Sequence, residues 1–189
     1  MNKAVFLDRD GTINVDKNYL YKIEDFEFLP GVIEGLKILQ DAGFILIIVT
    51  NQSGIGRGYY TEEDFKRLNE WMIKELKKCG VHISKVYYCP HIPNSSVEKY
   101  RKKCNCRKPL LGMFENAIAD FGISISESWV IGDKVRDCLI CEKYDCKGFL
   151  VEQVLYDNES LYKEYPKLKD KVSCSRSVLE CAKKIVHFN

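Results

Sequence analysis

Apolar residues are grouped along this chain in short continuous runs, and longer amphipathic stretches separate these runs. A continuous apolar run is typical of a strand buried on both faces, whereas apolar positions three or four residues apart predict a helix. The predicted strands are residues 3–8, 44–50, 85–88, 128–133 and 147–151. The predicted helices are residues 31–43, 110–121, 134–144 and 175–186, with one more that Thr61 caps and whose apolar face includes Phe65, Leu68, Met72 and Leu76.

Strands alternate with helices, and this alternation predicts an α/β fold: a Rossmann-like parallel sheet flanked by helices on both faces. The 189 residues are long enough for a substantial core, and we expect a single domain over residues 1–189. After residue 152 the pattern weakens, and we expect the tail only to pack a last helix on the sheet.

Two segments lack a regular period. Residues 11–30 carry aromatic side chains among charges, and we interpret them as a flap beside the end of the first strand. Residues 89–106 form an insertion that contains cysteines and a histidine. The glycines at positions 54, 56 and 58 lack the Gly-Lys-Ser/Thr of a P-loop, so a flexible turn is the better interpretation.

Polar side chains follow three of the predicted strands at the point where each strand ends. Asp8 and Asp10 follow the first strand, Thr50 and Asn51 end the second, and Asp133 ends the fourth. Gly11 allows the chain to turn sharply after Asp10. Because parallel strands end at a common edge, which is where open α/β sheets bind ligands, we expect these side chains to converge.

Carboxylates held close together repel one another unless a cation lies between them. Oxygen ligands favour Mg²⁺, which often takes a substrate phosphate as a further ligand. An ionised aspartate can attack phosphorus and form an aspartyl-phosphate, and a second group must then protonate the leaving oxygen. Asp8 and Asp10 can divide these tasks, while Thr50 and Lys108 supply a hydroxyl and an ammonium for the phosphoryl oxygens.

The cysteines indicate a metal site. The first residues lead directly into the first strand, so we expect no signal peptide, a cytoplasmic location and no disulfide framework for the nine cysteines. Three thiols and one imidazole lie in the polar insertion and make a closed tetrahedral zinc set: Cys89, His91, Cys104 and Cys106. The alternative is core cysteines with a surface histidine. We interpret the other six cysteines as small apolar residues.

Composition excludes several classes of protein. The net charge is only +2, which does not suggest a nucleic-acid or membrane surface. No apolar run approaches the length of a membrane span. We expect a monomer that acts on a small molecule.

The ordered motifs resemble those of the haloacid dehalogenase superfamily of phosphatases. They are Asp8-Arg9-Asp10-Gly11-Thr12, Val49-Thr50-Asn51, Lys108-Pro109 and Gly132-Asp133-Lys134 followed by Asp137. The resemblance implies that Asp8 is the nucleophile, that Asp10 is the general acid and base, and that Thr50 and Lys108 hold the phosphoryl group. It also implies Mg²⁺ at Asp8, the Asp10 carbonyl and Asp133, with Asp137 orienting a metal-bound water or Lys134.

The cysteine insertion and the run of residues 51–58 are similar to those of heptose 1,7-bisphosphate 7-phosphatases, which serve nucleotide-heptose synthesis for surface polysaccharide such as lipopolysaccharide. The flap and zinc loop leave little room for a large cap domain, so we expect a small phosphorylated sugar as substrate. The resemblance places the substrate against Asp16, Lys17, Asn18, Tyr19, Thr50, Asn51, Gln52, Ser53, Arg107 and Lys108. The family usually has an Ala-Gly pair where this chain has Asp145-Cys146. The resemblance therefore does not predict the conformation of the turn before the fifth strand.

Two other readings stay open at this stage. The zinc loop is also related to that of histidinol-phosphate phosphatases, although theirs is typically shorter. A zinc-bearing binding module without catalysis is the second alternative. Against it, each position required by the chemistry is filled: Asp8, Asp10, Thr50, Lys108 and Asp133.

Overall fold

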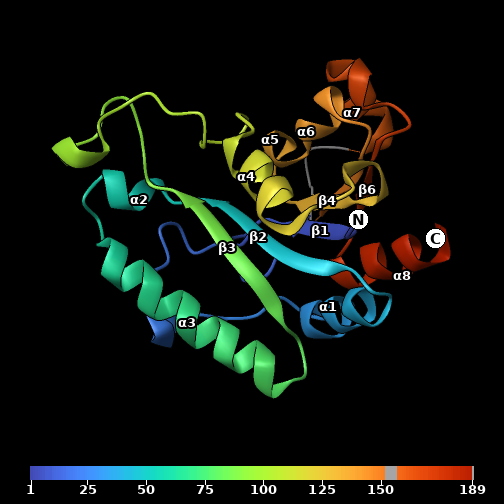
Figure 1. Ribbon diagram of the computed structural model, residues 1–189. Helices are drawn as coiled ribbons and strands as arrows, with labels where there is room; N and C mark the ends of the chain where they lie inside the picture. Colours follow the sequence, from blue (N-terminus) through green and yellow to red (C-terminus); the bar gives the residue numbers. More distant parts are fainter. Residues whose placement is uncertain (152–156, 189) are drawn as a thin grey trace.

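The computed structural model describes residues 1–151 and 157–188, and its centre is a six-stranded parallel sheet (Figure 1). The strand order is β3-β2-β1-β4-β5-β6. The strands are β1 (Ala4–Leu7), β2 (Ile45–Asn51), β3 (Ile83–Cys89), β4 (Trp129–Gly132), β5 (Lys147–Val151) and β6 (Val172–Ser175). The predicted α/β fold with a parallel sheet is therefore confirmed. The single-domain expectation includes 152–156 and 189, which lie outside the described residues.

Helices cover both faces of the sheet (Figure 1). One face packs against α1 (Val32–Asp41), α3 (Glu62–Lys78) and α8 (Val178–Phe188). The other packs against α4 (Gly112–Phe121), α5 (Val135–Cys138), α6 (Ile140–Lys143) and α7 (Asn158–Glu164). Side chains alternate along the central strand β1, with Val5 and Leu7 in the first core and Ala4 and Phe6 in the second. Burial on both faces explains why the strands read as continuous apolar runs.

Local signals set the long helix α3. The Thr61 hydroxyl accepts a hydrogen bond from the Asp64 backbone N–H at 3.1 Å, and the Asp64 carboxylate accepts one from the Thr61 N–H at 3.0 Å. This reciprocal capping satisfies two donors at the start of the helix. The predicted apolar face is buried as a block: Phe65, Leu68, Met72 and Leu76.

The structure corrects the prediction in the last third of the chain. Residues 134–144 form two short helices, α5 and α6, that meet at Leu139. The tail contributes α7 and a sixth strand as well as a last helix, and this helix begins at Val178, after the strand. The strand β6 reads Val-Ser-Cys-Ser, without the apolar run of an inner strand, because it lies at the sheet edge beside β5. The turn at Asp145-Cys146 leads directly into β5 at Lys147.

Two short features position the site. The single-turn helix α2 (Ser53–Gly56) follows β2 directly at its carboxyl end. The predicted flap is irregular apart from one turn of 3-10 helix at Ile23–Asp25, and the insertion 89–106 contains only one such turn, at Glu98–Tyr100. Among the described residues, no helix has both the length and the apolar character needed to cross a membrane.

Candidate active site at the carboxyl ends of the strands

Three adjacent strands, β2, β1 and β4, bring their predicted polar residues together. Asp8 follows β1, Thr50 lies near the end of β2, and Asp133 follows β4. Carboxylate oxygens of Asp8, Asp133 and Asp137 all lie within 4.8 Å of one another, and the three residues are buried. Asp8, Thr50 and Asp133 therefore lie together at one edge of the sheet, as the sequence predicted.

Two glycines make room for these carboxylates. Gly11 has a φ of +81°, and a Cβ there would lie 2.5 Å from an Asp133 carboxylate oxygen. A Cβ on Gly132 would lie 2.3 Å from Cβ of Asp137. Any larger residue would push one of the carboxylates out of the cluster, so both glycines are part of the site.

The Lys108 ammonium is the cation at the centre of the cluster. Its Nζ lies 2.7 Å from Asp8 Oδ1, 2.7 Å from Asp137 Oδ1 and 2.6 Å from the Val49 carbonyl oxygen. An ammonium has three N–H donors, so each has an acceptor. Asn51 holds the backbone of the same lysine, because its amide donates to the Lys108 carbonyl at 3.1 Å and accepts from the Lys108 N–H at 3.0 Å. The ion pair of Lys108 with Asp137 was not predicted.

Burial dominates the electrostatics of the cluster. It raises the pKa of Asp8 to about 7, against the opposing effect of Lys108, and it also raises the pKa of Asp133. Burial alone would lower the pKa of Lys108, but Asp137 and Asp8 outweigh it and raise that pKa. Lys134 also pairs with Asp133 from a half-exposed position. Three buried carboxylates and one buried ammonium leave an excess of negative charge, and this all-oxygen donor set fits Mg²⁺.

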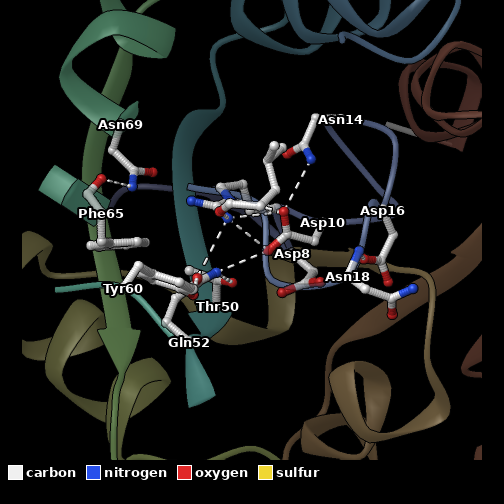
Figure 2. A network of polar contacts seen from close by, with 12 residues as sticks. Asp8, Asp10, Asn14, Asp16, Asn18, Thr50, Gln52, Tyr60, Phe65 and Asn69 are labelled. Atoms are coloured by element: carbon white, nitrogen blue, oxygen red, sulfur yellow. Dashed lines mark hydrogen bonds and ion pairs between the residues drawn. The ribbon is translucent and has the colours of Figure 1, made fainter. Parts of the chain in front are cut away.

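The Asp10 carboxylate lies beside this cluster in a cage of donors (Figure 2). Arg9 donates to it from Nε at 3.1 Å and from an NH2 group at 2.9 Å. Asn14 and Gln52 donate side-chain amide hydrogens to it at 3.0 and 2.9 Å. The Arg9 side chain is fully buried, with its guanidinium 5.4 Å from the Phe65 ring centre. The cage holds Asp10 in one orientation at the wall of the pocket.

A pocket of about 290 Å³ opens above the cluster. Its lining includes these residues expected at the site: Asp8, Asp10, Asp16, Asn18, Tyr19, Asn51, Gln52, Ser53, Arg107 and Asp133. Thr50 and Lys108 are buried beneath it. Lys17 is not among the lining residues, and its ammonium pairs with Glu27 at 3.3 Å on the surface.

The pocket also contains residues to which the sequence reasoning gave no role in the site: Arg57, Tyr60 and Arg136. Arg57 follows the glycine run, and Arg136 lies within the motif that begins at Gly132. Their position beside recognised motifs was a usable signal for both arginines. Tyr60 carried no such signal, because its role depends on which buried side chain its hydroxyl contacts.

The four predicted zinc ligands form the second cluster. The Sγ atom of Cys89 lies 3.5 Å from that of Cys104 and 3.0 Å from that of Cys106, and His91 Nδ1 lies 3.3 Å from Cys106 Sγ. Zinc–sulfur bonds of about 2.3 Å in a tetrahedron place sulfurs roughly 3.8 Å apart, so a small expansion accommodates the ion. Burial raises the pKa of the Cys89 thiol, and a bound cation would offset this effect.

The remaining cysteines divide by environment. Cys138, Cys141, Cys146 and Cys181 are buried in the cores, as small apolar residues would be. Cys174 is partly buried, and Cys79 is exposed at the end of α3. Cys79 is therefore not buried as a small apolar residue would be.

Comparison of this chain with known proteins identifies its family. The family model of polynucleotide kinase 3 phosphatase matches residues 3–147. The D-glycero-beta-D-manno-heptose-1,7-bisphosphate 7-phosphatase of Haemophilus ducreyi is 52% identical over 141 residues, which are 74% of this chain and 77% of that protein. The protein of the same name from Escherichia coli K12 is 49% identical over 134 residues, which are 71% of this chain and 70% of that one.

A solved structure agrees in fold. The D,D-heptose 1,7-bisphosphate phosphatase from B. bronchiseptica, complexed with magnesium and phosphate, has a TM-score of 0.81 at 24% identity and covers 99% of both chains. At that identity the likeness concerns the fold, and the relatives of about 50% identity carry the family. On this evidence the chain belongs to the haloacid dehalogenase-like family of the D-glycero-β-D-manno-heptose-1,7-bisphosphate 7-phosphatases.

Proposed function

We propose that this protein is a Mg²⁺-dependent phosphatase that removes the 7-phosphate of D-glycero-β-D-manno-heptose 1,7-bisphosphate. The observation that carries the proposal is the buried cluster of Asp8, Lys108, Asp133 and Asp137 at the strand ends, in a chain about half identical to enzymes of that name. The β anomer follows the names of these relatives, since the sequence by itself left the anomer open.

Asp8 is the nucleophile in this proposal. One carboxylate oxygen of Asp8 bonds to the 7-phosphorus while the bond between phosphorus and the C7 oxygen breaks, and Asp10 gives its proton to the leaving oxygen. Water then attacks the aspartyl-phosphate, Asp10 takes the proton, and the phosphorus–oxygen bond to Asp8 breaks. Thr50 and Lys108 lie beneath the pocket, where a hydroxyl and an ammonium can hold the phosphoryl oxygens.

Two metal ions complete the proposal. Asp8, Asp133 and the Asp10 carbonyl would hold Mg²⁺, which would neutralise charge on the phosphoryl group. The relative with a TM-score of 0.81 was solved with magnesium and phosphate. Cys89, His91, Cys104 and Cys106 would hold a structural zinc with no open coordination position. Arg107 and Lys108 directly follow Cys106, so this zinc would hold both cations at the pocket.

The remaining phosphate needs cations of its own, and three arginines line the pocket: Arg57, Arg107 and Arg136. Among the described residues, none of the three forms an ion pair with a carboxylate, so their charge is available to an anion. Asp16 and Asn18 of the flap provide partners for sugar hydroxyls. A bisphosphorylated sugar therefore fits this pocket better than a monophosphate does. Histidinol phosphate carries a single phosphate, so a histidinol-phosphate phosphatase with the same zinc loop would not need cations for a second one.

We expect the enzyme to act as a cytoplasmic monomer in the synthesis of nucleotide-activated heptose for lipopolysaccharide. Few large apolar side chains are exposed among the described residues, which supports a monomer. They are Met1, Tyr19, Tyr59, Leu110, Val186 and Phe188. Light scattering of the purified protein after gel filtration measures the mass, and a stable dimer would contradict this expectation.

The test of the function is phosphate release in the presence of Mg²⁺. The substrates are both anomers of heptose 1,7-bisphosphate, histidinol phosphate and a 3′-phosphorylated oligonucleotide, each with wild type and Asp8→Asn. We expect rapid release from the β anomer, and Asp8→Asn should lower kcat by at least about 10⁴-fold because it lacks the nucleophile. Faster release from histidinol phosphate or the oligonucleotide would overturn the substrate. Full activity of Asp8→Asn would overturn the nucleophile.

A further inference from the structure

Gln52 joins two residues of the proposed reaction. Its side-chain amide Nε2 lies 2.9 Å from Asp10 Oδ2 and 2.9 Å from Thr50 Oγ1, so one NH₂ group donates to both (Figure 2). Gln52 is only 2% exposed, so water has little access to its amide. The amide therefore ties the carboxylate of Asp10 to the hydroxyl of Thr50.

Tyr60 holds the oxygen end of that amide, whose direction Arg9 and Asp10 determine. Its phenolic hydroxyl donates to Gln52 Oε1 at 2.6 Å, and an Arg9 NH2 group lies 3.4 Å from the same oxygen. Rotating the amide by 180° would place its NH₂ against the Arg9 donors and its oxygen against the Asp10 carboxylate. Both contacts would be repulsive, so only one orientation satisfies every group. Burial raises the pKa of Tyr60, so its hydroxyl stays protonated and available as a donor.

The orientation of Gln52 also sets what Thr50 can do. The Thr50 oxygen accepts from the Gln52 amide, and the hydroxyl hydrogen is then left to donate in another direction. Thr50 is 1% exposed and lies beneath the pocket, where a phosphoryl oxygen is the expected acceptor. A rotated amide would present its oxygen to Thr50 and capture that hydrogen.

The fold makes a specific place for Tyr60. A Cβ on Gly54 would lie 2.2 Å from the Tyr60 ring, so only glycine allows the ring to lie there. The ring stacks on Tyr21 of the flap with centres 5.3 Å apart and planes inclined by 13°. Tyr60 is 6% exposed. Its hydroxyl is thus held in position from both sides.

We propose that Tyr60 is a positioning residue that acts through Gln52, holding the Asp10 carboxylate and the Thr50 hydroxyl in the orientation that phosphoryl transfer requires. The inference rests on the phosphatase activity proposed above. Asn14 donates to the other carboxylate oxygen of Asp10 and Arg9 donates to both oxygens, whereas Gln52 is the group that links Asp10 to Thr50.

The first experiment compares Tyr60→Phe with Tyr59→Phe on heptose bisphosphate. Tyr59 is the matched control, because its ring is 55% exposed and it is not among the residues that line the pocket. We expect Tyr60→Phe to lower kcat by about 5–20-fold with KM changed less than about twofold. Tyr59→Phe should match wild type. A raised KM with unchanged kcat would mean that Tyr60 contacts the substrate directly and would overturn the inference.

The second experiment asks whether Tyr60 acts through Gln52. In a Gln52→Met background, Tyr60→Phe should change kcat by less than about twofold, because the amide that it holds is gone. Multiplicative losses of kcat in the double variant would overturn the inference. If wild type releases no phosphate from the sugar, the proposed function has failed instead.

A readout without catalysis covers the case in which Gln52→Met does not fold. Hydrogen exchange of the Gln52 side-chain NH₂ can be followed by NMR in ¹⁵N-labelled protein. We expect this exchange to be at least about tenfold faster in Tyr60→Phe than in wild type, while Tyr59→Phe leaves it unchanged. Equal exchange rates in wild type and Tyr60→Phe would contradict the positioning role, whatever the activity.

Discussion

Two polar clusters of this protein differ in how their charge is balanced. The carboxylate cluster of Asp8, Asp133 and Asp137 is buried and contains its own cation, Lys108. The thiol cluster of residues 89–106 is mostly half-exposed, and its four ligand atoms contact one another instead of a protein cation. We therefore expect the carboxylate cluster to be organised before any metal binds and the thiol cluster to depend on zinc for its order.

The largest expected effect comes from removing the internal cation. In Lys108→Met, two buried carboxylates lose their partner, so the free energy of unfolding should fall by about 3–5 kcal/mol. Activity should fall by at least about 10³-fold, since a group on the phosphoryl oxygens is lost. Chemical denaturation and initial rates measure the two effects. Adding Asp137→Asn should restore part of the stability but not the activity; if it restores none, Lys108 does not balance that carboxylate.

Breaking the thiol cluster should have an intermediate effect. Cys104→Ser removes one zinc ligand, and we expect activity to fall by about 10–100-fold because the loop that holds Arg107 and Lys108 loses its order. Metal content and hydrogen exchange over residues 89–106 measure the cause. Cys79→Ser, at an exposed cysteine, is the control and should behave as wild type. Full activity in a variant that demonstrably lacks zinc would show that the loop is ordered without metal.

The two clusters should respond to pH in opposite directions. The pKa of Asp8 is raised to about 7 in the folded protein, so the folded state binds this proton more tightly than the unfolded state does. The resulting stabilisation is present at low pH and is lost as the pH rises through about 7. Zinc binding weakens as the pH falls, because its thiolates become protonated.

This contrast can be measured without added Mg²⁺, with zinc retained. Between pH 5 and 8, the free energy of unfolding of wild type relative to Asp8→Asn should decrease as the pH rises. Added Mg²⁺ should flatten that dependence, since the ion stabilises the ionised carboxylate. A difference between the two proteins that stays constant with pH would argue that Asp8 is ionised throughout this range.

The smallest expected effect concerns the cations outside both clusters. Arg136→Gln should raise KM for the bisphosphate by about 3–10-fold and leave kcat nearly unchanged, because Arg136 lines the pocket and its proposed role is to hold the phosphate that is not cleaved. Lys17→Gln is the matched control and should change KM by less than about twofold, since Lys17 pairs with Glu27 on the surface. Equal effects of the two substitutions would remove Arg136 from the proposed anion site.

Much of the site could be predicted because it depends on strand ends. A buried strand is visible as an apolar run, and parallel strands end at one edge, so Asp8, Thr50 and Asp133 could be brought together without coordinates. The cluster of Cys89, His91, Cys104 and Cys106 could be predicted because residue type and spacing carry its chemistry. Lys17 illustrates the limit, since the motif could place it on the flap but could not give the direction of its side chain.

Individual contacts between buried side chains could not be predicted. The side chains of Lys108 and Asp137 form an ion pair at 2.7 Å although 29 positions separate them in the chain. The residues around either one give no indication of this contact. The hydroxyl of Tyr60 reaches Gln52 because Gly54 leaves space for its ring. The strand β6 carries two serines among its four residues, so only its pairing with β5 identifies it as part of the sheet.

The sequence by itself was sufficient for the α/β class, for the convergence of the carboxylates at the strand ends and for the set of three cysteines and one histidine that cluster. These features follow from periodicity, from the shared edge of parallel strands and from ligand chemistry, all of which are local or general. The tertiary structure was needed for the partners of each buried charge and for the orientation of each buried amide. Such pairings depend on which side chains the packed fold brings within hydrogen-bond distance, and no local pattern in the chain carries that information.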